Sequence, residues 1–386
     1  MSNLLQICEK HSYNLGHRWN PSKYVVLNPA NQLLTYYLYW DPLPARSSFP
    51  YLGAPIRPGV YLHTFELITN NINKSLETMN QLAMIGLKPD GFDQLLATRF
   101  YKQIVWAQLE YGLAISKVIS LLSNKLEDAQ NICLRRNFGS SSRSSIKVML
   151  QLTKLPTMTE RVHILQAQFL LRSLSLPDDT LLACLLPHIR LSKGHSQWYT
   201  ISKNPLLERS IQYISCLDKR LLKKLRLQYL QDNLEQRRAA RNSGLLSLRR
   251  PKISLDPILW LPMSRIDRSR CVRWRLGWLS GYKTVPCARH QSELFTKQHA
   301  IHCLNIHRRL QILETTTDPL SFLLNRLPNS KPRSRQVKLF WSFKWPILCS
   351  ILQEMGYLYH KKVPLQPANL GKPLINWLHR SCQKCY

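Results

Sequence analysis

Apolar residues recur every three or four positions through most of the chain after Pro58. This spacing places them on one face of an α-helix, whereas a half-buried strand would show strict alternation. Helices are therefore predicted in five stretches, namely 62–72, 95–105, 115–126, 160–174 and 218–241. The last stretch carries leucines near one face and many basic residues, so we expect a long, basic amphipathic helix there.

The residues before Pro58 follow a different pattern. A β-branched run at 24–27 and an aromatic run at 35–40 are followed by Asn-Pro and Asp-Pro pairs, which is typical of short strands and turns. Further along, the serine-rich stretch 139–145 indicates a loop, and 242–256 indicates a linker. The sequence therefore predicts a mainly α fold with a small α+β part at the N-terminus.

The chain is strongly basic, with 54 Lys and Arg against 22 Asp and Glu and a formal net charge of +32. Because 44% of the residues are hydrophobic, the composition excludes a simple basic disordered chain. A folded chain with this charge attracts a polyanion, either nucleic acid or an anionic membrane surface. No membrane partner is expected, because the basic helix predicted at 218–241 has no Trp or Phe to anchor it.

Basic residues with little acid near them define the predicted nucleic-acid interface. Such residues can neutralise phosphates and release counterions, although a charge run can also be only a solvated face. The candidates are Arg220, Lys223, Lys224, Arg226, Arg237 and Arg238 in the basic helix, and Arg273 and Arg275 on either side of Trp274. Trp274 and Trp278 are four residues apart and are expected in the core, with stacking on unpaired bases as the alternative.

Several classes of protein are excluded by what the sequence lacks. It has no run of 18 apolar residues and no basic, then apolar, N-terminal signal. Its ten cysteines are therefore expected to be reduced thiols or metal ligands, in the nucleus or cytoplasm. No P-loop, Gly-rich phosphate loop or Ser/His/Asp triad is recognisable, so no small-molecule substrate is expected.

A Cys/His cluster has the spacing of a zinc site. Cys287 and His290 form one close pair, and His299 and Cys303 form a second pair after a short loop. Two such pairs suit one tetrahedral Zn²⁺ ion, and the alternative is a chance scatter of polar residues. His302 competes with His299 for the third position, and the spacing favours His299. Cys382 and Cys385 have no second pair nearby and are expected to be ordinary surface thiols.

Four motifs, taken in order, resemble one family. Residues 11–23, with the pattern Gly-x-x-x-Asn-x-x-Lys, resemble the segment after the catalytic Asp-Asp box in non-LTR (LINE-type) reverse transcriptases. Residues 49–56 look like the Tyr-Leu-Gly motif at the palm–thumb junction of that family, and residues 99–112 are similar to its thumb-side helices. Residues 275–277 and the Cys/His cluster match its C-terminal zinc-knuckle region, although the family usually has Cys where this chain has His290.

The resemblance implies a C-terminal part of such a polymerase, with five consecutive regions. These are a palm remnant at 1–58, a helical thumb-like region at 59–140, a basic helical connection at 141–250, a zinc-knuckle-like region at 251–327 and a basic aromatic tail at 328–386. Its implied partners are RNA, DNA or both, and its implied cofactor is one Zn²⁺.

The catalytic carboxylates of the family would lie upstream of the segment with which this chain begins. Nucleotidyl transfer needs them to hold Mg²⁺, so Mg²⁺ is expected only if that upstream palm is present. The one Asp-Asp pair in the chain, Asp178 and Asp179, follows a proline and better fits a helix start. Lys23 aligns with a palm lysine that can protonate pyrophosphate, but without the carboxylates it has no reaction to assist.

We therefore expect a nucleic-acid-binding chain that is not catalytic alone. One alternative is the tail of a longer, in-frame RNA-directed DNA polymerase. Another is a free-standing basic RNA-binding protein with a zinc knuckle.

Overall fold

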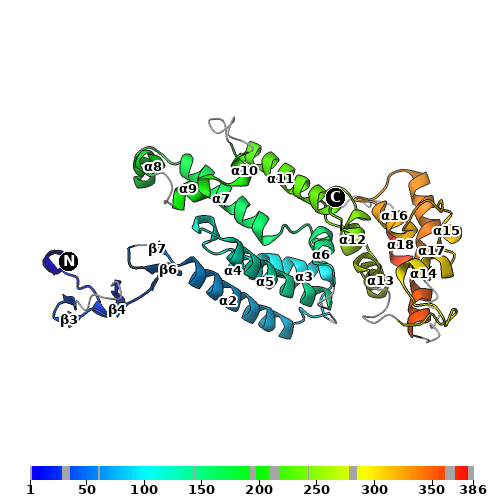
Figure 1. Ribbon diagram of the computed structural model, residues 1–386, viewed down its shortest axis with the longest axis horizontal. Helices are drawn as coiled ribbons and strands as arrows, with labels where there is room; N and C mark the ends of the chain where they lie inside the picture. The colour runs from blue at the N-terminus through cyan, green and yellow to red at the C-terminus, as the bar shows by residue number, and fades with distance from the viewer. Residues whose placement is uncertain are drawn as a thin grey trace. The chain divides into compact units, whose positions relative to one another are not determined.

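Figure 1 shows a computed structural model of the chain. The structure describes residues 2–27, 35–59, 61–89, 91–141, 144–191, 197–208, 218–241, 243–277, 285–360 and 370–380. Across these residues the protein is mainly helical, and its short strands precede the first long helix, α2 (Thr64–Met84). The predicted fold class, mainly α with a small N-terminal α+β part, is therefore confirmed.

The chain divides into two compact units, each assembled from distant segments. The first unit comprises Met1–Glu77, Trp106–Leu126 and Val162–Ile211, and the second comprises Thr78–Val105, Glu127–Arg161 and Gln212–Tyr386. The five consecutive regions that the resemblance implied stay a prediction.

The N-terminal residues form a helix and three very small sheets. The elements are α1 (Ser2–Asn14), η1 (Pro21–Lys23), β1 (Val26–Leu27), β2 (Tyr37–Leu38), β3 (Asp41–Pro42), β4 (Ala45–Arg46), β5 (Phe49–Tyr51), β6 (Ala54–Arg57) and β7 (Tyr61–Leu62). Strand β1 pairs parallel with β4, β2 pairs antiparallel with β3, and β5, β6 and β7 form an antiparallel sheet. The aromatic strand predicted at 35–40 is shorter than expected, because Tyr39 and Trp40 have positive φ angles and turn the chain into β3.

The Tyr-Leu-Gly motif forms the tight turn between β5 and β6. Tyr51 pairs with Ala54, and Leu52 and Gly53 between them have φ angles of 48° and 78°. Two consecutive positive φ angles are the signature of a two-residue hairpin turn, which favours glycine. The ring of Tyr111 packs against Gly53, and its hydroxyl donates to the carbonyl of Leu52. Two of the four motifs, 49–56 and 99–112, therefore contact each other.

The remaining elements in the described part of the chain are helices. In chain order they are α3 (Gln94–Phe100), η2 (Tyr101–Val105), α4 (Trp106–Glu110), η3 (Leu113–Ile115), α5 (Ser120–Phe138), α6 (Ile146–Thr153), α7 (Met158–Leu174), α8 (Leu181–Leu191), α9 (Gln197–Ser202), α10 (Pro205–Glu208), α11 (Lys219–Ala239), α12 (Gly244–Ser247), η5 (Pro257–Leu259), α13 (Arg265–Leu276), α14 (Lys297–Cys303), α15 (Ile306–Leu310), α16 (Pro319–Asn325), α17 (Arg335–His360) and α18 (Lys372–His379).

Side-chain caps determine where several helices of the second unit begin. Asp218 accepts a hydrogen bond from the backbone N–H of Leu221 at 2.6 Å, and α11 starts immediately after it, close to the predicted start. Thr296 caps α14 in the same way, and Asp318 caps α16. A side-chain oxygen at this position satisfies a backbone donor that the helix itself leaves unpaired.

One prediction about the second unit was wrong. Residues 242–256, expected to be a linker, include α12 and the buried Arg249, which donates to the Ser321 hydroxyl and to the Arg275 carbonyl. The region named as a basic aromatic tail, 328–386, includes α17 and α18, and Trp341 and Trp345 on α17 are buried. These segments join the core of the unit because their aromatic and paired basic side chains pack against distant helices.

No helix in the described part of the chain is long and apolar enough to cross a membrane.

Candidate metal centre and basic surface

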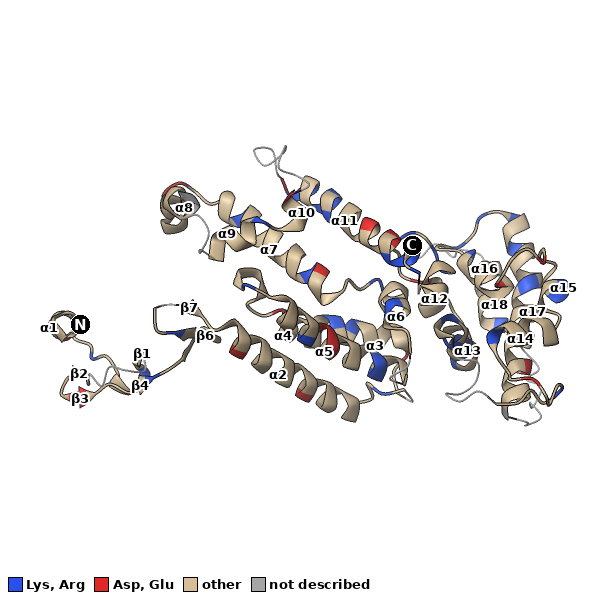
Figure 2. Ribbon diagram, in the orientation of Figure 1, with Lys and Arg blue, Asp and Glu red and all other residues tan. Residues whose placement is uncertain are grey.

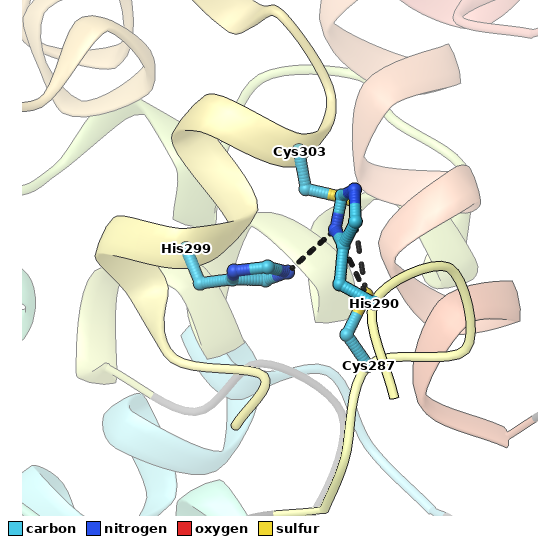
Figure 3. Close-up of side chains that lie close together, drawn as sticks. All are labelled: Cys287, His290, His299 and Cys303. Atoms are coloured by element: carbon cyan, nitrogen blue, oxygen red, sulfur yellow. Dashed lines mark hydrogen bonds between the residues drawn. The ribbon is translucent and has the colours of Figure 1, made fainter. Parts of the chain in front are cut away.

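Four side chains from two short elements meet in the second unit (Figure 3). Cys287 and His290 lie on a loop that closes on itself, because the Cys287 N–H donates to the Glu293 carbonyl at 2.8 Å and Pro286 bridges to Leu294. His299 and Cys303 lie on α14, where a separation of four residues puts both on one helix face.

The spacing of the ligand atoms fits a tetrahedral zinc ion. Around such an ion two sulfur ligands lie about 3.8 Å apart, two nitrogen ligands about 3.3 Å and a mixed pair about 3.6 Å. The corresponding distances are 3.8 Å between the Cys287 and Cys303 sulfurs and 3.3 Å between His290 Nδ1 and His299 Nε2. Cys287 Sγ lies 4.0 Å from His290 Nδ1, a few tenths of an ångström longer. The cluster could therefore hold one metal ion such as zinc.

Glu293 orients one of the four ligands. Its Oε2 atom lies 2.5 Å from Nδ1 of His299, which leaves Nε2 of that ring facing the other ligand atoms. A carboxylate on the second ring nitrogen is a frequent partner of metal-binding histidines, because it holds the ring orientation and makes the ligand more basic. Glu293 was not among the predicted site residues, although its position as an acidic residue between the two ligand pairs was a signal for this role.

The two thiols of the cluster differ in acidity. Burial raises the pKa of Cys287, but the backbone N–H groups of His290 and Arg289 and the side chain of His299 stabilise the thiolate, and the pKa falls to about 6. Burial and the neighbouring Cys287 raise the pKa of Cys303 to about 11. Without a cation the pair therefore holds one thiolate beside one thiol, and a divalent ion would favour deprotonation of both.

Of the two competing histidines, the structure brings His299 to the other three side chains. His299 is in the cluster, whereas His302 is exposed and is not among the four residues that meet. Adjacent residues on a helix point about 100° apart, so His302 and Cys303 diverge.

A buried ion pair holds α14 against its neighbours. Nζ of Lys297, the first residue of α14, lies 2.5 Å from Oδ2 of Asp318 and 4.3 Å from the ring centre of Trp274. The Trp274 indole donates to Asp318 at 3.2 Å. Trp274 is 1% exposed, which confirms its predicted place in the core. The helix carrying His299 and Cys303 is thus attached to α13 and α16.

Arg275 belongs to the same interior. Its side chain is fully buried, its Nη2 lies 3.1 Å from Asp256 Oδ2, and its Nη1 donates to Asn325 at 2.6 Å. The sequence analysis placed this residue at the nucleic-acid interface. Because this guanidinium is buried and paired, it is not accessible to a nucleic acid, and Arg275 is not part of the proposed interface.

The predicted basic residues of α11 fall into two groups (Figure 2). Arg220, Lys223 and Lys224 are exposed, and Arg226 is half-buried. Arg237 instead pairs with Glu160 at 2.6 Å, and Arg238 donates to backbone carbonyls, including those of Ser247 and Arg249. The first half of α11 therefore presents cations outward, whereas the second half uses them to hold neighbouring segments.

The other candidate residues are separate from these sites. Lys23 and Arg273 are exposed, and Asp178 and Asp179 lie in an exposed turn directly before α8, in agreement with the predicted helix start. Trp278, Cys382 and Cys385 lie outside the described residues.

No model of a known protein family matches the chain, and no significant match was found among curated proteins or solved structures.

Proposed function

We propose that this protein binds RNA or DNA through the outward-facing cations of α11, and that it also holds a zinc ion through Cys287, His290, His299 and Cys303. The observation that carries the proposal is the arrangement of charge at the start of α11. Its first turn contains Lys219 and Arg220 and no acidic residue.

This arrangement costs the helix stability. The N-terminus of a helix bears partial positive charge, so Lys219 and Arg220 are unfavourable in its first turn, and the acidic side chain that partly offsets them is the N-cap Asp218. Lys219 and Lys223, and also Arg220 and Lys224, are like-charged pairs four residues apart, each unfavourable by about 0.2 to 0.5 kcal/mol. A bound polyanion would relieve all of these repulsions at once, and counterions released from its phosphates would add to the affinity.

Neutralising this face is expected to weaken binding and its dependence on salt. For Arg220, Lys223 and Lys224 all replaced by Gln, the slope of log affinity against log salt for a single strand should become shallower by about 2, since each lost phosphate contact removes about 0.7. Fluorescence anisotropy with a labelled U12 strand at several salt concentrations measures that slope.

A matched control removes the same charge elsewhere. Lys88, Lys147 and Lys252 are exposed lysines of the second unit outside α11, and their joint replacement by Gln lowers the net charge equally. Equal effects of the two triple variants would show that α11 has no special role and that only the total charge matters.

We also propose, from the order of the four motifs, that the chain is a C-terminal part of a LINE-type reverse transcriptase that lacks the catalytic aspartates and is inactive alone. Two observations are compatible with this: helix α1 is followed by the short strand β1, and Tyr111 contacts the Leu52–Gly53 turn. Neither is specific to that family.

Sequencing the transcript and the genomic DNA upstream of the Met1 codon tests this second proposal. A decayed upstream frame, with stops or frameshifts after a recognisable palm, is the expected result for an inactive remnant. An intact frame with an aromatic-x-Asp-Asp box would favour a working polymerase, and unrelated sequence would favour a free-standing binding protein.

A further inference from the structure

A cleft of about 530 Å³ lies in the second unit between α18 and the segment that leads into α13. Its lining residues are Pro262, Ser264, Lys372, Pro373, Asn376, Trp377 and Arg380. This volume is within the usual range for small-molecule pockets and can accommodate one nucleotide. Apart from Asn376, Ser264 and two cations, the lining is a tryptophan and two prolines.

The α13 side of the cleft is held in place by one arginine. Arg268 donates to the carbonyls of Ile258, Leu259 and Leu261, which closes the turn that precedes Pro262. The same turn carries Trp260, whose ring meets that of Trp377 edge to face with centroids 6.2 Å apart. The contact with Trp260 therefore helps to hold the Trp377 ring in position.

The α18 side is attached to α17. Gly371 has a φ angle of 71°, and a Cβ there would lie 2.4 Å from the ring of Trp345, so only glycine allows this close approach. Leu374 and Leu378 are buried, and the imidazole of His379 is 2.7 Å from the Ser342 hydroxyl. Both sides are fixed by contacts outside the cleft, so its shape is formed in advance of any ligand.

The charge of the cleft indicates what it binds. Lys372 and Arg380, one at each end of α18, are exposed cations, and none of the lining residues that the structure describes is acidic. Aromatic rings stack on unpaired bases, and adjacent cations hold the phosphates of the strand. A purely apolar ligand would gain nothing from the two cations, and an acidic peptide would gain little from the ring.

We propose that this cleft takes one unpaired nucleotide of a single strand. The base lies against Trp377, the amide of Asn376 hydrogen-bonds to its edge, and Lys372 and Arg380 bind the flanking phosphates. This inference rests on the proposed function and deepens it, because α11 recognises phosphates alone whereas the cleft recognises a base.

Two probes separate the base from the backbone, namely a labelled dT12 strand and a 12-residue abasic strand with the same phosphates. The intact chain should bind dT12 more tightly than the abasic strand. Trp377→Leu should lower the affinity for dT12 by about 5- to 100-fold, the range found when a stacked base loses its aromatic partner, and should leave the abasic strand unchanged. Trp377→Phe, which keeps a ring, should lose less.

Two controls show whether a loss of affinity comes from the cleft or from a general defect of the variant. Phe343→Leu removes an exposed aromatic side chain of α17 that does not line the cleft, and it should bind both strands like the intact chain. Thermal melting identifies a variant that fails to fold, and the Trp377→Phe comparison then carries the result. Equal losses in the Trp377 and Phe343 variants, or equal affinity of the intact chain for both strands, would overturn the base site while leaving phosphate binding intact. If the intact chain binds neither strand, the proposed function itself fails.

Discussion

A chain with Cys287 replaced by serine is expected to lose the zinc that the intact chain binds at about one equivalent. A structural zinc site needs thiolates, and serine is a far poorer ligand. In zinc-finger peptides the apparent free energy of zinc binding is about 10 to 16 kcal/mol, most of which is also folding free energy. The segment around the cluster also has little secondary structure of its own: the β-bridge between Pro286 and Leu294 and the seven-residue helix α14. Metal analysis of purified protein measures the loss.

Two comparisons make the zinc prediction specific to the cluster. His302→Asn changes an exposed histidine next to Cys303 and should retain the full equivalent of zinc. Cys184→Ser changes an exposed cysteine of the first unit and should also retain it. An unchanged zinc content in Cys287→Ser would remove the site assignment.

The second large effect is expected for Asp318→Asn, which should lower the free energy of unfolding of the second unit by about 3 to 5 kcal/mol. Removing one partner of a buried ion pair leaves the other charge buried without compensation. Here that charge is the ammonium of Lys297, which lies 2.5 Å from Asp318 and is 20% exposed. Asparagine keeps the size of the side chain and can still accept from the Ser321 N–H, so the variant isolates the charge.

Urea denaturation followed by circular dichroism measures this change. Asp179→Asn serves as the control, because Asp179 lies in an exposed turn and its replacement should change stability by less than about 0.5 kcal/mol. Adding Lys297→Met to Asp318→Asn should restore part of the stability, since it removes the unpaired ammonium. A single Asp318→Asn variant as stable as its control would show that the pair contributes nothing.

The same carboxylate gives stability a defined dependence on pH. Burial raises the pKa of Asp318, but Lys297 and the hydroxyl and N–H of Ser321 outweigh burial and hold the pKa below the ordinary value of 3.8. The stabilisation is therefore complete above that ordinary value and is lost as the pH falls through the lowered pKa. The Asp318→Asn chain should lack this acid-dependent component.

The elements that the sequence predicts well are those determined locally. The spacing of Leu222, Leu225, Leu230 and Leu234 predicts α11, and Asp218 marks its start. The choice of His299 follows from its spacing, because residues four positions apart, such as His299 and Cys303, lie on the same face of a helix. In both cases the contacts that determine the local structure join residues within about one or two helical turns of each other.

The features that the sequence analysis missed depend on distant partners. The local sequence around Arg275 suggests an exposed cation, but in the structure its guanidinium is buried and bound to Asp256 and Asn325. Arg249 lies in a segment expected to be a linker, and Ser321 is its partner more than seventy residues away. Buried cations need such partners to offset the cost of leaving water, and a local pattern of charge contains no information about them.

The most direct test of the account is the salt dependence of binding between the intact chain and a single-stranded oligonucleotide. Five basic residues occupy the first half of α11, namely Lys219, Arg220, Lys223, Lys224 and Arg226. If α11 contacts about four phosphates through them, log affinity for U12 should fall with log salt with a slope of about −3. Binding that does not change with salt, or no binding at low salt, would contradict the claim that this protein recognises nucleic acid through that helix.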